Sequence, residues 1–150
     1  MEAKSWNAAI DLNYVLKQAE QFELFQLVRV LENYLLSISV ALPTKLLPIG
    51  KQFFPEQEKL FFTNRNSLQF TRYEVTRLML HENSDDAMAC KLQLETPILG
   101  ILGVVGALPY FYTELANNRV KHKDLALTEF LDLFQHRLLT LYYRTWKKHH

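Results

Sequence analysis

Residues 125–148, LALTEFLDLFQHRLLTLYYRTWKK, carry the clearest helical pattern of the sequence. Apolar residues recur there at three- and four-residue spacing, which is the period of an α-helix. One stripe consists of Leu127, Phe130, Leu131, Phe134, Leu138, Leu141 and Tyr142, with Leu133, Leu139 and Tyr143 beside it and Trp146 extending it. A helix that is apolar on almost every side is expected to be buried, either within its own domain or by a partner.

Burial by a partner would explain this apolarity, because a chain of 150 residues has few elements with which to surround so long a helix. Arg137 and Arg144 lie seven residues apart on one face, between aromatic residues. Each guanidinium is suited to a planar, two-bonded contact with a carboxylate across an interface. The alternative is that both arginines lie over the domain's own surface, with their aliphatic stems on apolar groups.

A second helical pattern lies near the start of the chain, where a long helix is predicted from about Val15 to Ser37. Its apolar positions include Leu24, Leu27, Val28 and Leu31. Residues 1–13 carry little pattern and are expected to form a flexible arm. Residues 14–150 are expected to form a single domain, since their number suits one.

The middle of the chain predicts strands, because the helical period is lost there and short apolar or alternating runs appear. These runs are residues 60–62, 68–70, 75–81 and 88–95. Asn64–Asn66 and Asn83–Asp86 are expected to be turns, since Asn and Asp favour them. Together with the helices, the strands predict an α+β fold with a small antiparallel sheet in the middle.

Gly100, Gly103 and Gly106 form a regular run that ends at Pro109. The spacing is not the G-x-G-x-x-G of dinucleotide binding, and no Lys-Ser/Thr pair follows, as a phosphate-binding loop requires. A tight turn or close backbone packing is the favoured interpretation. A small-ligand (anion) binding domain that uses this loop remains the alternative. Pro109 suits the start of a short helix, which is expected to end near Asn117.

Composition argues against several classes of protein. The net charge is +1 and the basic residues are spread along the chain, so no stripe for nucleic acid is expected. Cys90 is the single cysteine and lies in an apolar alternation, which indicates an inert core thiol. Residues 96–113 are uncharged but rich in Gly and Pro, which favours a buried loop over direct membrane insertion. The polar first residues predict a cytoplasmic protein.

Few side chains could serve in catalysis or metal binding, and those few lack the neighbouring residues that such sites require. Asp132 and His136 are four residues apart, so both could coordinate one metal ion. No third metal-binding side chain lies at a characteristic spacing from them. An ion pair or hydrogen bond on a polar edge of the helix is the simpler interpretation. Glu56 and Glu58 form an acidic pair expected to be solvated in a loop. No catalytic, cofactor-binding or metal-binding residue is predicted, so the chain is not expected to be an enzyme.

Two blocks carry a resemblance to a known family. GILGVVGALPYFYTEL, residues 100–115, followed by FLDLFQHRLLTLYYRTWKK, residues 130–148, resembles TssG (also ImpH or VasB), a baseplate subunit of bacterial type VI secretion systems. Pro48-Ile49-Gly50, Glu58 and residues 67–70 are also similar to the family pattern. Val104 stands where a proline is common, which changes the rigidity expected of the loop. The resemblance covers about residues 22–148 and implies the N-terminal part of a TssG-like protein.

The resemblance implies a structural role without catalysis or cofactor. It implies binding to TssF, assembly with TssK, TssE and the VgrG hub, and a cytoplasmic location at a baseplate docked on the inner membrane complex. Interface hot spots favour Trp, Tyr and Arg. The predicted interface residues are Leu108, Pro109, Arg137, Tyr142, Tyr143, Arg144 and Trp146.

Overall fold

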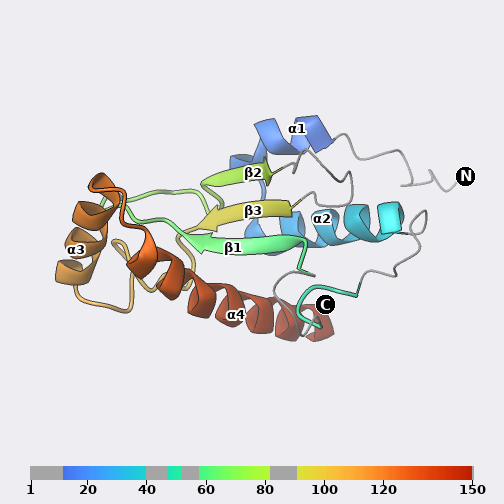
Figure 1. Cartoon of the computed structure of the whole chain (residues 1–150). Helices are drawn as coiled ribbons and strands as arrows, with labels where there is room; N and C mark the ends of the chain where they lie inside the picture. Colours follow the sequence, from blue (N-terminus) through green and yellow to red (C-terminus); the bar gives the residue numbers. More distant parts are fainter. Residues whose placement is uncertain (1–11, 40–46, 52–57, 82–90, 150) are drawn as a thin grey trace, which may run out of the picture.

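The computed structural model describes residues 12–39, 47–51, 58–81 and 91–149 (Figure 1). Its elements are α1 (Leu12–Lys17), a 3-10 turn (Ala19–Gln21), α2 (Leu24–Ser39), β1 (Leu60–Asn64), β2 (Arg77–His81), β3 (Lys91–Thr96), α3 (Tyr110–Lys121) and α4 (Ala126–His149). The predicted α+β class is confirmed. Within the described ranges, no helix has both the length and the apolarity to cross a bilayer.

The sheet has the order β1-β3-β2, with β3 parallel to β1 and antiparallel to β2. The sheet is therefore mixed, and the expectation of purely antiparallel pairing was wrong for β1. The last strand in sequence takes the central position, where its side chains Leu92 and Leu94 are almost fully buried. The position of β3 between β1 and β2 depends on pairing between distant segments, which turn residues in the sequence do not predict. Met88, Cys90 and the turn at Asn83–Asp86 lie outside the described residues.

Residues 68–70 were predicted as a strand and form none. Local side-chain bonds replace ladder bonds in this loop: the Gln69 N–H donates to Ser67 Oγ over 3.1 Å, and the Tyr73 N–H donates to Thr71 Oγ1 over 3.2 Å. Such Ser/Thr turns compete with extended pairing. Phe70 in this loop is 79% exposed.

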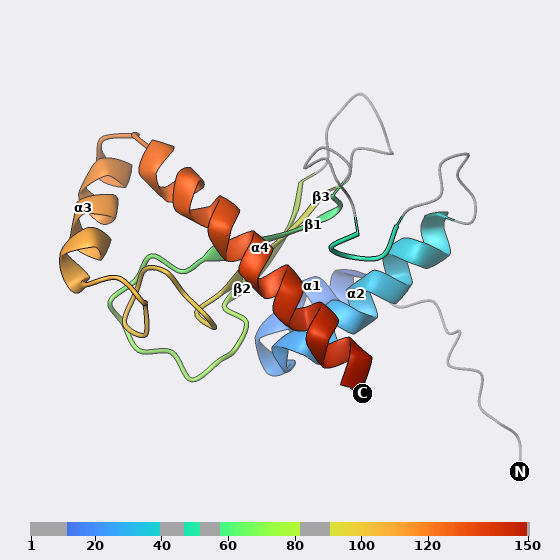
Figure 2. The same ribbon diagram turned by 90° about the horizontal axis from the view of Figure 1, so that it is seen from below.

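The core lies between one face of the sheet and α2. Figure 1 shows α2 behind the sheet, α1 beside β2 and α4 along the outer edge of β1, and Figure 2 shows α4 crossing that edge. Alternate strand residues point toward α2, so they are buried while their neighbours are not. The core comprises chiefly Leu24, Leu27, Val28, Leu31, Leu60, Phe62, Leu92, Leu94, Leu139 and Tyr143.

The predicted N-terminal helix is interrupted. Phe22 adopts extended backbone between the 3-10 turn and α2. The Leu24 N–H, at the start of α2, donates to Glu74 Oε2 over 2.8 Å, so a residue fifty positions away caps the helix. The interruption lets α1 and the 3-10 turn contact β2.

The short helix after the glycine run is longer than predicted, because α3 passes through Asn117 and ends at Lys121. Lys123 then takes a left-handed backbone, φ 61°, and the Asp124 N–H donates to the Arg119 carbonyl. This bond pattern is that of a Schellman cap. Pro109 precedes α3 at its N-cap instead of lying in the first turn.

Candidate interaction surface on the C-terminal helices

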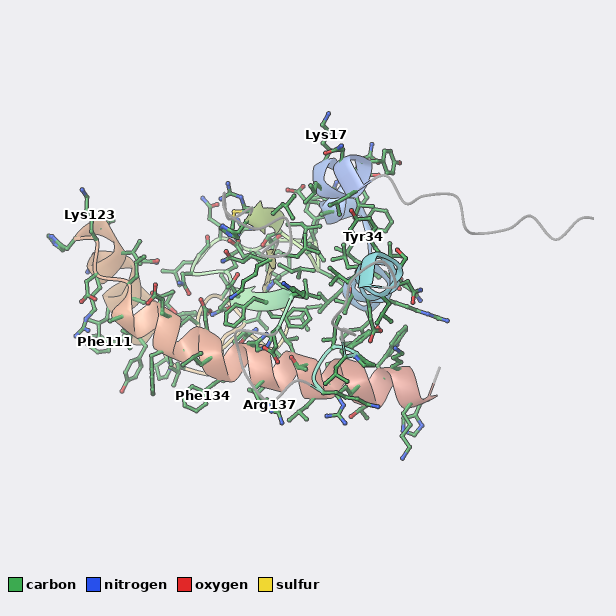
Figure 3. The ribbon with its side chains drawn as sticks, turned by 45° about the vertical axis from the view of Figure 1, so that its right-hand side comes forward. Lys17, Tyr34, Phe111, Lys123, Phe134 and Arg137 are labelled. Atoms are coloured by element: carbon green, nitrogen blue, oxygen red, sulfur yellow. The ribbon has the colours of Figure 1, made fainter. Side chains whose placement is uncertain are left out.

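The face of α4 that packs on the sheet is mostly polar. Its buried residues are Asp132, Gln135, His136, Leu139, Thr140 and Tyr143. The apolar stripe predicted from the sequence lies on the opposite side, where Phe134 is 51% exposed and Leu138 is 50% exposed. Figure 3 shows Phe134 and Arg137 pointing away from the sheet. Burial of this stripe within its own domain, one of the two expectations, is therefore wrong.

The polar side of α4 faces the sheet because β1 is an edge strand with backbone donors to satisfy. The Phe62 N–H donates to Nδ1 of His136 over 3.1 Å, and the Asn64 N–H donates to Oδ1 of Asp132 over 2.9 Å. Four helical residues rise about 6.0 Å and two strand residues about 6.6 Å, so the two spacings nearly match. Asp132 and His136 thus take the place of a neighbouring strand at this edge.

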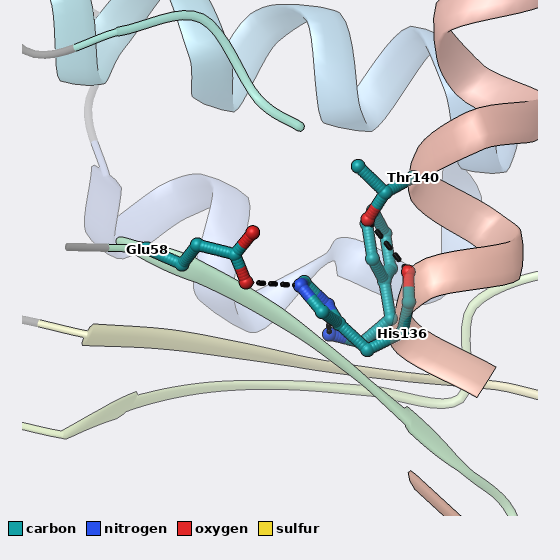
Figure 4. A network of polar contacts seen from close by, with 4 residues as sticks. Glu58, His136 and Thr140 are labelled. Carbon is teal, nitrogen blue, oxygen red and sulfur yellow. Dashed lines mark hydrogen bonds and ion pairs between the residues drawn. The ribbon is translucent and has the colours of Figure 1, made fainter. Parts of the chain in front are cut away.

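His136 is held as a neutral ring. Its Nδ1 accepts a bond, so its proton sits on Nε2, which contacts the carboxylate of Glu58 (Figure 4). Burial lowers the pKa of His136, and the attraction of Glu58, which raises it, only partly compensates. The Phe61 ring stacks on the imidazole with centroids 4.4 Å apart. Glu58, expected to be solvated, is therefore partnered.

Asp132 is also buried, and burial raises its pKa to about 6 although the Asn64 N–H favours the ionised form. Asp132 and His136 are both hydrogen-bonded on the polar side of the helix, as the simpler interpretation expected, and their partners are backbone N–H groups of β1. Within the described residues, no group of three His, Cys, Asp or Glu side chains is placed to hold a metal ion.

A second polar cluster anchors the other half of α4 to α2. Glu32 is 2% exposed and accepts from the Tyr143 hydroxyl over 2.7 Å, from the Lys147 ammonium over 2.6 Å and from the Ile49 N–H over 3.3 Å. Burial and Glu32 raise the pKa of Tyr143. In the sequence, Glu32 is a polar position among the apolar positions of its helix. Its buried role was not visible, because its partners lie in distant segments.

The segment before β1 fits against this half of α4. Gly50 has φ +78°, and a Cβ at this position would overlap Cγ2 of Thr140. The Arg144 guanidinium donates to the Gly50 carbonyl over 3.1 Å. The Pro48-Ile49-Gly50 motif is thus a close-packing site for α4.

The glycine run is bonded within the protein. The Gly103 N–H donates to Thr113 Oγ1, the Gly100 N–H to the Pro97 carbonyl and the Gly106 N–H to the Gly103 carbonyl. Gln135 of α4 adds two bonds, accepting from the Ile101 N–H and donating to the Ile98 carbonyl. These glycine amides are not arranged as a cradle for an anion, so the geometry favours the packing interpretation.

The exposed apolar side of α4 is named here the outer face. It consists of Phe130, Leu133, Phe134, Leu138, Leu141 and Tyr142, which are 43–55% exposed. Phe130 and Phe134 meet edge to face, with ring centroids 5.1 Å apart. In α3, Tyr110 and Phe111 are also exposed. A row of exposed apolar side chains of this kind on a folded chain is a candidate interaction site.

The predicted interface residues fall into three groups. Arg137 and Tyr142 are exposed on or beside the outer face. Tyr143 is 1% exposed, and its ring and that of Trp146 both contact Phe25 and each other, so both residues belong to the contact with α2.

Arg144 is exposed but bonded to Gly50, Leu108 is partly buried, and Pro109 is exposed beside α3. Their role at an interface stays a prediction. The outer-face residues were visible in the sequence as an apolar stripe with Leu133 beside it, and burial by a partner was one of the two expectations for that helix. Of these residues, only Tyr142 was named in the predicted interface.

The sequence of the chain matches a known protein family. A family model described as "Type VI secretion, TssG" matches residues 18–150, which is most of the chain. Neither the search of curated proteins nor the search of solved structures gave a match. The matched range contains the glycine run, the Pro-Ile-Gly motif and both polar clusters of α4. The chain therefore belongs to the TssG family, a structural family of the type VI secretion baseplate.

Proposed function

We propose that the chain is a scaffold subunit of the type VI baseplate wedge and that it binds TssF through the outer face. TssK, TssE and the VgrG hub are the further partners expected for such a subunit, and the cytoplasmic side of the inner membrane complex is its expected location. The role is one of geometry and binding energy. The family membership supports the baseplate part of the proposal.

The outer face is the observation that carries the proposal. Its six apolar side chains follow helical spacing along α4, and each leaves about half of its surface in water. Burying a Leu or Phe side chain completely contributes about 1.5–3 kcal/mol, so covering these half-exposed groups yields several kcal/mol in total. That gain is sufficient to drive association with a partner of complementary shape.

The charge around the outer face favours a partner surface that contains acidic side chains. Residues 133–149 contain no Asp or Glu, while Arg137 lies exposed between Phe134 and Leu138. Guanidinium groups bind carboxylates in a planar, two-bonded geometry. We therefore expect the TssF surface to combine apolar side chains with at least one carboxylate facing Arg137.

The test is co-expression with TssF followed by affinity purification. In the variant Phe134→Ser/Leu138→Ser, the Kd should rise roughly thirty-fold or more, equivalent to about 2 kcal/mol, because two central apolar contacts are lost. The matched control is Leu68→Ser/Phe70→Ser, which removes two exposed apolar side chains from the loop before β2. Undiminished binding by the first variant, or equal loss in both, would refute the assignment of the outer face.

A further inference from the structure

We propose that Asp132, Gln135 and His136 are positioning residues that set the rotation of α4 about its axis, and so decide that its apolar face is presented to partners. The proposal concerns this chain alone and holds whichever subunit covers the outer face. It follows from the distribution of polar and apolar groups around the helix.

Helix α4 has two opposite faces with the same helical period. The inner face contains Asp132, Gln135, His136, Leu139, Thr140 and Tyr143, and the outer face contains Phe130, Leu133, Phe134, Leu138, Leu141 and Tyr142. Hydrophobic sorting alone would turn the more apolar face toward the sheet. The observed rotation is the reverse, so directional bonds must select it.

Those bonds are specific to one rotation. Asp132 and His136 accept the N–H groups of Asn64 and Phe62, which point outward from the edge of β1. Gln135 lies one turn away and bonds both to the Ile101 N–H and to the Ile98 carbonyl. A rotation by one residue is about 100° and would carry these side chains away from their partners. Backbone donors of β1 would then be buried without acceptors.

The rotation can be read from the reactivity of single thiols in a Cys90→Ser background. Leu138→Cys reports on the outer face, where Leu138 is 50% exposed, and Thr140→Cys reports on the inner face, where Thr140 is 0% exposed. With the native positioning residues, the thiol at position 138 should react at least about ten-fold faster, because a buried group reacts only on local opening.

The decisive variant is Asp132→Ala/Gln135→Ala/His136→Ala, which removes the directional bonds and leaves the outer face the more apolar of the two. We expect helical circular dichroism to persist and the ratio of the two labelling rates to fall toward one as other rotations become populated. Adding Phe130→Ser/Phe134→Ser should restore a high ratio, because it weakens the hydrophobic gain from turning the outer face of α4 toward the sheet. A folded triple variant with the native ratio would overturn the proposal.

Three further variants distinguish a change of rotation from a loss of fold. Asp132→Asn/His136→Asn keeps an acceptor at each position and should keep the native ratio. If the triple variant does not fold, the ratio is measured in Asp132→Ala and in His136→Ala, and each should lower it part of the way. A native ratio in both single variants would also overturn the proposal.

Discussion

At the scale of the residue, His136 joins three parts of the structure through one ring. Its Nδ1 accepts the Phe62 N–H, its Nε2 contacts Glu58, and its face stacks on Phe61. The first bond requires the neutral ring, because a protonated Nδ1 would oppose another donor. The contacts therefore make the protonation state of one side chain part of the packing between α4 and β1.

This requirement predicts a pH dependence of stability. The pKa of His136 is lowered from its ordinary 6.5 in the folded chain, so the unfolded chain takes up the proton first as pH falls. The contribution of His136 to the free energy of unfolding should therefore be complete above about pH 7 and decline below 6.5.

The contribution of His136 is measured by urea titrations of the native chain and of His136→Asn between pH 5 and 8. Asp132 acts in the opposite sense: its pKa is raised from 3.8 to about 6, so stability attributed to it is lost as pH rises through that interval. Asp132 is present in both the native chain and His136→Asn, so its contribution largely cancels when the two free energies of unfolding are subtracted. A difference that does not shrink toward acid pH would contradict the neutral-ring assignment.

At the scale of the element, α4 is held by short segments that fit its surface closely. Gly50 is the tightest of these contacts, with a left-handed backbone and no room for a Cβ beside Thr140. Glu32 and Arg144 add bonds from either side, so the segment before β1 is clamped between α2 and α4. The position of the helix along its axis depends on this fit.

Gly50→Ala should therefore destabilise the fold by about 2–4 kcal/mol, since it adds both backbone strain and overlap. Chemical denaturation gives the value. In a Thr140→Ser background, which removes Cγ2, the same substitution should cost about 1 kcal/mol less, because part of the overlap is relieved. Equal costs in the two backgrounds would mean that the clash with Thr140 is not what makes glycine necessary here.

The elements also show where reading from the sequence succeeds and fails. The extent of α4 was predicted to within one residue at each end, because a long periodic pattern is a strong signal. The interruption before Leu24 was missed, since the cap comes from Glu74 in a distant loop. Residues 68–70 were misassigned because local Ser/Thr bonds replaced the expected ladder.

At the scale of the whole molecule, the sheet is enclosed unevenly. α2 covers one face, α4 covers the β1 edge, and the outer face of α4 is left in water (Figure 1). The chain thus uses polar contacts to complete its own fold and leaves a row of apolar side chains of α4 exposed, which is the surface proposed to bind TssF. This division is what a structural subunit requires.

Binding should therefore protect one side of the molecule. With TssF present, the Leu138→Cys thiol should lose most of its reactivity, while a Phe70→Cys thiol on the loop before β2 should keep it. Both are read by mass spectrometry after timed labelling in the Cys90→Ser background. Protection of the second site alone would place the interface on the other side of the chain.

The amino-acid sequence by itself determined the α+β class, the helical period of α4 and the family, because residue spacing and short motifs within single segments identify all three. Only the tertiary structure decided the order of the strands, the burial of Glu32 and the direction in which α4 faces. The physical reason is the same in each case. An edge strand or a buried carboxylate must find hydrogen-bond partners, and those partners lie in segments far away in the sequence.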